Sequence, residues 1–66
     1  MRQWLLERRT EMGKTQLEIA ESSGIKREYY NMIENGYRKP SVTVAKKIGN
    51  AMDIEWTLFF EEKVTV

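Results

Sequence analysis

Four side chains between residues 27 and 32 have the chemistry needed to recognise the edges of nucleic-acid bases. They are Arg27, Glu28, Asn31 and Met32. Arginine donates two hydrogen bonds to guanine, glutamate accepts one from cytosine, asparagine pairs with adenine, and a methionine methyl packs on thymine. One good two-bond contact discriminates between bases by about 1–3 kcal/mol. The alternative interpretation is an ordinary solvated helix face, since charged side chains usually face water.

The residue types that dominate catalysis and metal binding are missing from this chain. It has no cysteine and no histidine, which removes disulfides, thiolate ligands, and the commonest metal ligand and general base. A catalyst would have to use Glu, Asp, Lys, Tyr or Ser, and no pair of these stands at a recognisable spacing. The sequence therefore predicts neither an enzyme nor a bound metal or other cofactor.

The length of the chain predicts one domain, residues 1–66, with a short C-terminal tail over residues 61–66. A domain of this size buries only about 60% of its unfolded surface, so its stability must come from helix packing, aided by dimerisation. No apolar run approaches the roughly 18 residues of a membrane span. The first residues also lack the features of a signal peptide. We therefore expect a cytoplasmic protein with no membrane partner.

Positive charge is concentrated in the middle of the chain, although the net charge is only +1. Residues 26–47 carry a net charge of +4 and residues 1–14 a net charge of +2. By contrast, residues 15–25 carry a net charge of −2 and residues 48–66 a net charge of −3. This asymmetry favours one side that faces nucleic acid and another turned away. A randomly mottled surface is the alternative.

Residues 16–35 have the pattern of two short helices joined by a tight turn. Thr15 and Glu18 have the spacing of a capping box, which predicts a helix that begins at residue 16. Ala20 is small where two crossing helices would touch, and Gly24 follows where the chain must reverse. Glycine takes a positive φ at such a turn without a steric cost. The pattern predicts a helix-turn-helix unit.

The second helix of this unit is expected over residues 26–34, with Asn35 and Gly36 ending it. At about 100° per residue, Tyr30, Ile33 and Glu34 share the buried side. Glu28 and Met32 then point most nearly away from the core.

Three further helices are expected over residues 2–12, 42–52 and 55–61, which gives a compact all-α fold with five helices. Ser41 is the expected cap of the helix over residues 42–52. Its predicted inner stripe is Val42, Ala45, Ile48, Gly49 and Met52. The tail residues 64–66 have strand propensity, and they either pair across a dimer or fray.

A set of residues spread over roughly residues 3–60 matches the pattern of a known family. The set comprises Arg9, Thr15-Gln16, Ala20, Gly24, Ile25, Ile33-Glu34-Asn35-Gly36 and Pro40-Ser41. With these residues the chain resembles the Cro/repressor-like (Xre family) helix-turn-helix domain. The pieces are specific as a set, although each alone is weak. The resemblance implies a lambda-repressor-like five-helix domain that binds operator DNA as a dimer.

The resemblance also implies roles for the matching residues. Bases would be read by outward positions of the second motif helix: Lys26, Arg27, Glu28, Asn31 and Met32. The DNA backbone would be contacted by the first motif residue and the following loop: Gln16, Asn35, Tyr37, Arg38 and Lys39. Arg9 would form a structural ion pair with Glu34. Tyr30 departs from the family, which usually has Ile, Val or Leu there. Its pocket is either enlarged or open at the DNA side for the hydroxyl.

Three aromatic residues near the C-terminus, Trp56, Phe59 and Phe60, are more than a small core readily hides. We expect part of this surface to form a homodimer interface, with a purely internal role as the alternative. The predicted function is a sequence-specific repressor that binds double-stranded DNA at a palindromic operator. Two alternatives keep the fold: an antitoxin that binds a toxin and represses its own operon, and an adaptor that binds only protein.

Overall fold

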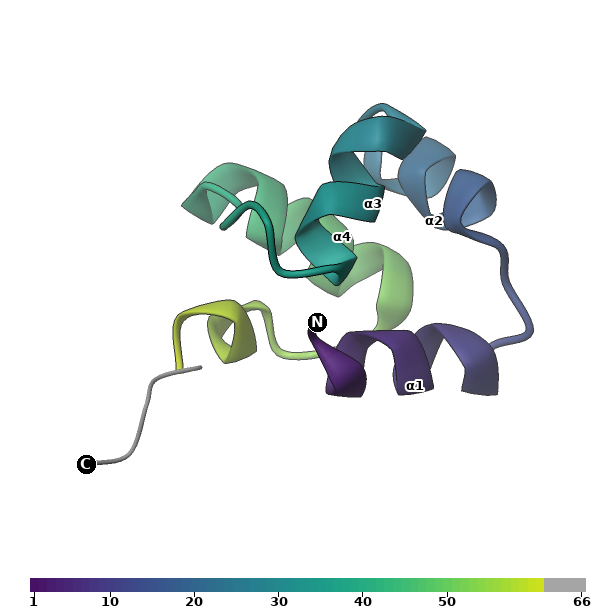
Figure 1. The fold of residues 1–66 in the computed structure, drawn as a ribbon, viewed down its shortest axis with the longest axis horizontal. Coiled ribbons are helices and arrows are strands. Elements are labelled where there is room, and N and C mark those ends of the chain that lie inside the picture. Colours follow the sequence, from purple (N-terminus) through teal and green to yellow (C-terminus); the bar gives the residue numbers. More distant parts are fainter. Residues whose placement is uncertain (62–66) are drawn as a thin grey trace.

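The computed structural model describes residues 1–61, which form four α-helices and one short 3-10 helix (Figure 1). In chain order these are α1 (Gln3–Glu11), α2 (Gln16–Ser23), α3 (Arg27–Glu34), α4 (Val42–Met52) and η1 (Trp56–Phe60). In Figure 1, α1 and η1 lie along one side of the molecule and α2 and α3 along the other, and α4 packs against both α2 and η1. The predicted all-α class is confirmed. The strand considered for residues 64–66 lies outside the described residues.

The junction between α2 and α3 follows the sequence pattern closely. Thr15 Oγ1 accepts a hydrogen bond from Glu18 N at 3.1 Å, and Glu18 Oε1 accepts one from Thr15 N at 2.8 Å, which completes the capping box. Gly24 ends α2 in the left-handed region at φ 70°. Ile25 N then donates to Ala20 O at 3.0 Å. Helix α3 begins one residue later than predicted, because Lys26 has an extended backbone.

Helix α4 has the predicted bounds, and Ser41 Oγ accepts a hydrogen bond from Val44 N at 3.2 Å. The prediction that Val42 belongs to the inner stripe is wrong, because Val42 is 48% exposed. It is the first residue of α4 and directly follows an exposed loop, whereas Val44 packs against the core. Gly49 is buried because the chain after α4 returns across it. A Cβ at this position would lie 2.8 Å from Ile54 O.

The fifth element differs from the prediction, because residues 56–60 form a 3-10 helix and not an α-helix. The segment is only five residues long, and the Glu55 side chain makes no capping hydrogen bond. Leu58 N donates to Glu55 O at 3.1 Å, which is the tighter spacing typical of short 3-10 pieces. This winding directs Phe59 into the core, where its ring lies edge-on to that of Trp4 at 5.0 Å between centroids.

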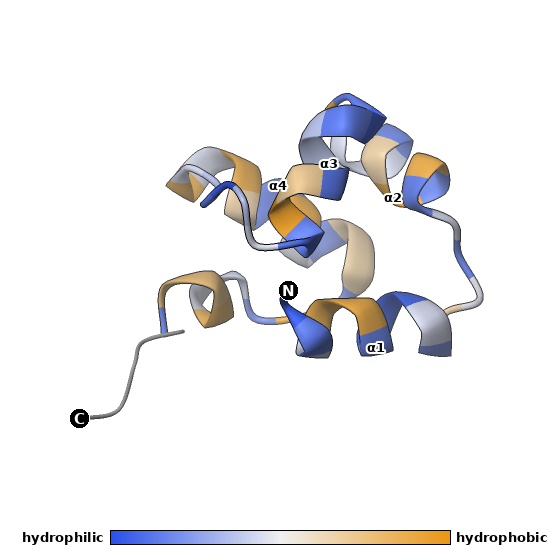
Figure 2. Cartoon of the chain, viewed as in Figure 1, coloured by the Kyte–Doolittle hydropathy of each residue, from blue (hydrophilic) through white to orange (hydrophobic). Residues whose placement is uncertain are grey.

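The core is one cluster to which every element contributes. Its buried apolar residues are Leu5, Ile19, Ala20, Tyr30, Ile33, Ala45, Ile48, Met52 and Phe59. Each helix combines hydrophobic and hydrophilic residues, as the colours of Figure 2 show. Among residues 1–61, no helix is long and apolar enough to cross a bilayer. Helix α3 packs against this core through Tyr30 and Ile33. Its polar side, which begins with the exposed Arg27 and Glu28, is not covered by the core.

Candidate nucleic-acid interface

Three exposed charged side chains lie at the start of α3: Lys26 at the N-cap, and Arg27 and Glu28 in the first turn. Arg27 Nη2 lies 4.0 Å from Glu28 Oε2, and the two side chains are 50% and 73% exposed. Ion pairs this exposed contribute at most about 1 kcal/mol, so either side chain can exchange its partner for a ligand. The outward direction predicted for Glu28 is confirmed by its exposure, whereas Met32, also predicted to point outward, is half-buried.

Met32 and Asn31, farther along α3, are half-buried. The backbone of Met32 helps to position the loop that follows α3, because its carbonyl oxygen accepts hydrogen bonds from Tyr37 N at 2.9 Å and Arg38 N at 3.3 Å. Asn35 Nδ2 donates to Asn31 O at 2.9 Å and stabilises the same turn. The loop therefore folds back against the last turn of α3.

The basic loop places its side chains in different directions. Tyr37 is 80% exposed, and Arg38 is also exposed. Lys39 Nζ instead lies 5.3 Å from the centre of the Phe60 ring, over η1. An exposed cation–π contact of this kind contributes about 0.5–1 kcal/mol, which a phosphate contact can replace. The loop thus spans the space between α3 and η1.

Arg2 is a residue of this region that the sequence patterns did not identify. Its guanidinium Nη1 donates to Ile33 O and, at 3.0 Å, to Arg38 O, while Arg2 N donates to Glu34 O at 2.8 Å. A cation near the last carbonyls of a helix also complements the negative end of the helix dipole. Arg2 therefore fixes the loop to the end of α3. No sequence signal points to it, since its partners lie 31 and 36 residues away.

Gln16 joins the N-terminus of α2 to the middle of α3. Its Oε1 accepts a hydrogen bond from Asn31 Nδ2 at 3.0 Å, and its Nε2 donates to Glu34 Oε2 at 3.0 Å. The structure thus brings Gln16 and Asn31 together beside the exposed turn of α3. The predicted base-contacting residues therefore lie on α3 or at its N-cap, with Gln16 and the loop through Arg38 beside them, whereas Lys39 lies over η1.

The carboxylate of Glu34 is buried at the centre of a polar network. Arg9 Nε donates to Glu34 Oε1 at 2.8 Å and Arg9 Nη2 to Oε2 at 3.1 Å, so the predicted ion pair is present. Tyr30 Oη donates to Oε1 at 2.9 Å. Tyr30 is fully buried, so its hydroxyl does not reach the surface. Of the two outcomes considered for Tyr30, this excludes the one in which the hydroxyl reaches the surface near the DNA.

These contacts shift three pKa values in directions that keep the network charged. Burial alone would raise the pKa of Glu34, but hydrogen bonds from Arg9, Gln16 and Tyr30 outweigh burial and hold it below its usual value. The hydrogen bond to Glu34 raises the pKa of Arg9. Burial, followed by the charge of Glu34, raises the pKa of Tyr30. The network therefore contains a carboxylate, a guanidinium and a neutral phenol near neutral pH.

The aromatic segment is only partly available at the surface. Phe59 is fully buried, so its predicted part in a dimer interface does not fit this fold. Phe60 is 36% exposed, and Trp56 is half-buried with Lys46 Nζ 5.1 Å from the centre of its ring. Of the three predicted interface residues, Trp56 and Phe60 therefore remain accessible in part.

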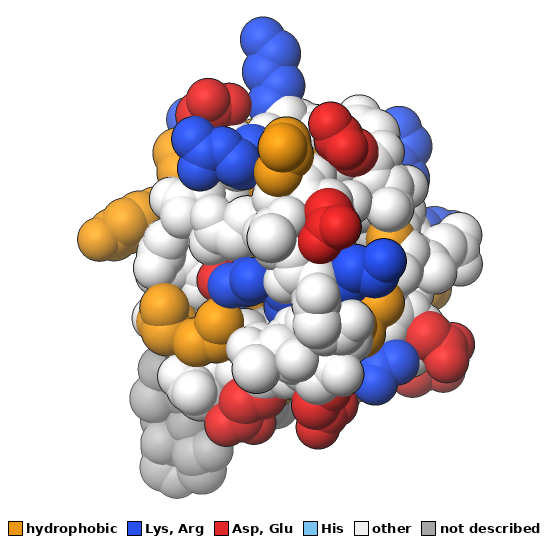
Figure 3. Space-filling view, turned by 90° about the vertical axis from the view of Figure 1, so that its right-hand side faces the viewer, with side chains coloured by type: hydrophobic (Ala, Val, Ile, Leu, Met, Phe, Trp, Pro, Cys, Tyr) orange, Lys and Arg blue, Asp and Glu red, His pale blue; other side chains and the backbone are white. Residues whose placement is uncertain are grey.

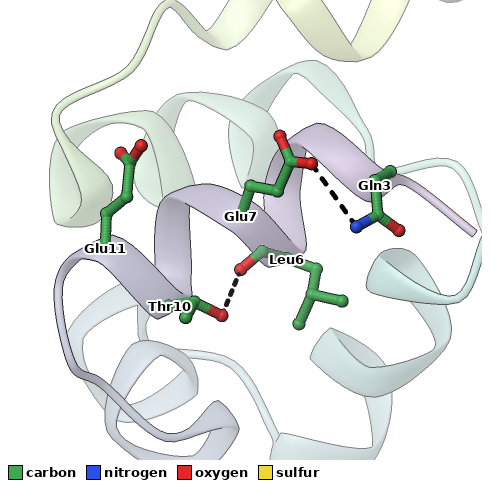
Figure 4. A pocket seen from close by; sticks show the side chains of 5 residues that line it. All are labelled: Gln3, Leu6, Glu7, Thr10 and Glu11. Atoms are coloured by element: carbon green, nitrogen blue, oxygen red, sulfur yellow. Dashed lines mark hydrogen bonds between the residues drawn. The ribbon is translucent and has the colours of Figure 1, made fainter.

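The rest of the described surface offers a shallow groove on α1 and no cluster of metal-ligating side chains. Among residues 1–61, no three His, Cys, Asp or Glu side chains lie close enough to hold a metal ion. A shallow groove follows one face of α1, lined by Gln3, Leu6, Glu7, Thr10 and Glu11 (Figure 4). None of the residues expected to contact DNA lines it. Figure 3 views the side with the α1–α2 connection, where acidic and basic side chains are mixed.

Comparisons with known proteins identify the family of this chain. The family model described as helix-turn-helix matches residues 5–59. The uncharacterized HTH-type transcriptional regulator YqaF of Bacillus subtilis (strain 168) is 56% identical over 62 residues, which cover 94% of this chain and 82% of that protein. No solved structure matches the chain. The match spans α2, the Gly24 turn and α3, and the chain belongs to the Cro/C1-type helix-turn-helix family.

Proposed function

We propose that this protein is a transcriptional regulator that binds double-stranded DNA in a sequence-specific manner, and that it acts as a homodimeric repressor on a palindromic operator. The observation that carries the proposal is the open polar side of α3, bordered by the Gln16 side chain and the loop through Arg38. A helix with one buried and one open polar side can enter the major groove while its domain remains packed.

In this proposal α3 selects bases and its surroundings hold the phosphates. Arg27, Glu28, Asn31 and Met32 differ in hydrogen-bonding chemistry, so together they distinguish base pairs in the major groove. Lys26 extends this surface at the start of α3. Gln16, Asn35, Tyr37, Arg38 and Lys39 contact the backbone. These backbone contacts fix the register of the protein on DNA and carry no sequence information.

The homodimer is proposed to form through η1. Leu58 and Phe60 are 37% and 36% exposed, although both belong to a short apolar segment. Covering them with the same segment of a second chain removes apolar area from water. Two copies related by a two-fold axis would place their α3 helices in successive major grooves.

DNA binding is tested by selection of bound duplexes from a randomised pool, followed by affinity measurements at several salt concentrations. We expect an enriched palindrome and an affinity that falls steeply with salt, because each neutralised phosphate releases counterions. The Arg38→Met variant should lower the slope of log affinity against log salt by about 1 at every sequence. Binding without enrichment would contradict base recognition, and no salt-dependent binding at all would favour a protein-binding adaptor.

The dimer is tested separately by sedimentation at micromolar concentration. The Phe60→Asp variant should shift the population toward monomer and weaken operator binding, while its helix content stays that of the unmodified protein. A monomer in both proteins, with equal operator affinity, would refute the dimer at η1. Repression is tested by in vitro transcription from a template with the selected site placed over a promoter, where added protein should reduce transcript yield.

A further inference from the structure

A chain of hydrogen bonds connects the buried carboxylate of Glu34 to the polar side of α3. Gln16 Nε2 donates to Glu34 Oε2 at 3.0 Å, and Asn31 Nδ2 donates to Gln16 Oε1 at 3.0 Å. Gln16 is the first residue of α2, whereas Asn31 and Glu34 lie on α3. This series of hydrogen bonds therefore runs from Glu34 on α3 to Gln16 on α2, and back to Asn31 on α3, which is nearer the surface.

Glu34 determines which group donates and which accepts in each of these hydrogen bonds. Its two oxygens accept hydrogen bonds from Arg9, Tyr30 and Gln16, and it is only 2% exposed. An ionised carboxylate has no proton to donate, so only the NH₂ end of the Gln16 amide can face it. The oxygen of Gln16 then faces Asn31. Asn31 must in turn direct its own NH₂ group toward that oxygen.

The result is one orientation of the Asn31 amide, although an isolated asparagine has two of similar energy. Among residues 1–61, no group donates a hydrogen bond to Asn31 Oδ1, and this oxygen is not a buried unsatisfied atom, so it meets solvent. One Nδ2 proton also remains available beside it, because only the other is donated to Gln16. An acceptor next to a donor is the complement of adenine N6 and N7 in the major groove.

We propose that Gln16 and Glu34 are positioning residues for base selection, which hold Asn31 with Oδ1 outward so that Asn31 selects adenine. This inference rests on the proposed function, since it requires α3 to lie in the major groove. It differs from the backbone contact implied for Gln16 by the family, because a phosphate contact favours no base over another. In the opposite orientation, Asn31 would set its NH₂ group against the adenine N6 donor.

The test compares the unmodified protein with the Gln16→Met, Asn31→Ala and Gln3→Met variants in duplex selection, followed by affinity measurements on single-base variants of the selected site. The unmodified protein should require adenine at one position in each half-site. Both Gln16→Met and Asn31→Ala should reduce that requirement on the order of tenfold and leave the preferences elsewhere intact. Gln3 is exposed on α1, so the same substitution there controls for the exchange of glutamine for methionine.

Combining Gln16→Met with Asn31→Ala sharpens the test. If Gln16 acts through Asn31, the double variant should prefer adenine as strongly as Asn31→Ala alone, because both changes remove the same contact. If Gln16→Met weakens binding to every sequence equally and leaves the adenine requirement unchanged, Gln16 acts only as a backbone contact and the positioning role is refuted. If the unmodified protein enriches no sequence, the proposed function itself fails, which is a different result.

A measurement on the free protein remains decisive even if Gln16→Met does not fold. In ¹⁵N spectra of the unmodified protein, the two Asn31 side-chain amide protons should differ in their rate of exchange with water. The proton donated to Gln16 Oε1 should exchange more slowly. The exposed Asn50 on α4 provides the reference, since its amide faces water. Asn31 signals that exchange as fast as those of Asn50 would refute the fixed orientation.

Discussion

The hydroxyl of Tyr30 makes a testable contribution to stability, because it is the group that distinguishes this position from the apolar residue usual in the family. It donates to Glu34 Oε1 at 2.9 Å inside the core, where Tyr30 is 0% and Glu34 2% exposed. The hydroxyl also lies 3.9 Å from Met52 Sδ, a weak acceptor in a fully buried residue. No water can replace the hydroxyl without opening the core.

Replacing Tyr30 with phenylalanine removes this donor and leaves Arg9 Nε as the remaining donor to Glu34 Oε1. Hydrogen bonds to charged groups contribute about 1.5–3 kcal/mol, so we expect Tyr30→Phe to lower the free energy of unfolding by about that amount. For a domain of this size, each kcal/mol corresponds to a change of about 4–8 °C in Tm. The total stability of such domains is only about 0.05–0.15 kcal/mol per residue, so the loss is a large fraction of it.

The assay is urea unfolding followed by tryptophan fluorescence, since Trp4 and Trp56 both pack against the core. Tyr37→Phe is the matched control, because Tyr37 is 80% exposed and its loss should change stability by no more than about 0.5 kcal/mol. Equal stability of Tyr30→Phe and Tyr37→Phe would refute the contribution assigned to the buried hydroxyl. An unchanged dependence on urea concentration would confirm that both variants unfold from similar folded states.

Three further predictions concern the Glu34 network and the close approach of the chain to Gly49. Arg9→Met leaves the Glu34 charge without its ion pair and should cost about 3–5 kcal/mol, measured by circular dichroism, whereas any folded protein should keep its base preference. A retained Tm together with a changed operator would contradict that role. Because the pKa of Glu34 is lower in the folded than in the unfolded chain, its contribution to stability should be complete above about pH 4.5 and lost as pH falls through the folded value. A Tm that does not fall between pH 6 and pH 3 would exclude it. Gly49→Ala should destabilise by about 1–3 kcal/mol, because its Cβ would lie 2.8 Å from Ile54 O, and Asn50→Ala on the exposed side of α4 should not.

Local signals in the sequence were enough to predict much of the fold. The capping box of Thr15 and Glu18, the left-handed Gly24 and the Ser41 cap each depend on residues within a few positions of one another. Such signals do not depend on how the helices pack against one another, provided that each helix forms. They predicted the start of α2, the turn before α3 and both ends of α4 correctly.

Most of the differences between prediction and structure depend on long-range packing. Arg2 and Arg8 donate to backbone carbonyls of α3 and α4, and backbone acceptors have no sequence signature. Val42 matches the phase of the α4 stripe, but it lies where the helix leaves the core. The sequence pattern also did not predict that η1 is a 3-10 helix. Phe59 and Phe60 are adjacent and of the same type, so the pattern does not determine which of them is buried. Phe59 is the buried one, packed on Trp4.

The Arg9–Glu34 pair was expected from the family resemblance alone, and its extension to Gln16 and Asn31 was not. Side-chain amides can donate or accept, so the sequence does not determine their partners. Only the placement of α2 against α3 brings Gln16 within reach of both residues. The part of the candidate site that orients other residues is therefore less predictable than the part that faces outward.

The arginines of α1 have a consequence for the order of folding. Arg8 donates to Met52 O and Arg9 binds Glu34, contacts that close loops of 44 and 25 residues. The helix itself has only nine residues and no side-chain cap at its start, so alone it is marginal in water. We therefore expect α2 and α3, joined through a short turn, to form early and α1 to dock late. Amides of α1 should accordingly exchange with solvent faster than those of α2 and α3 during refolding.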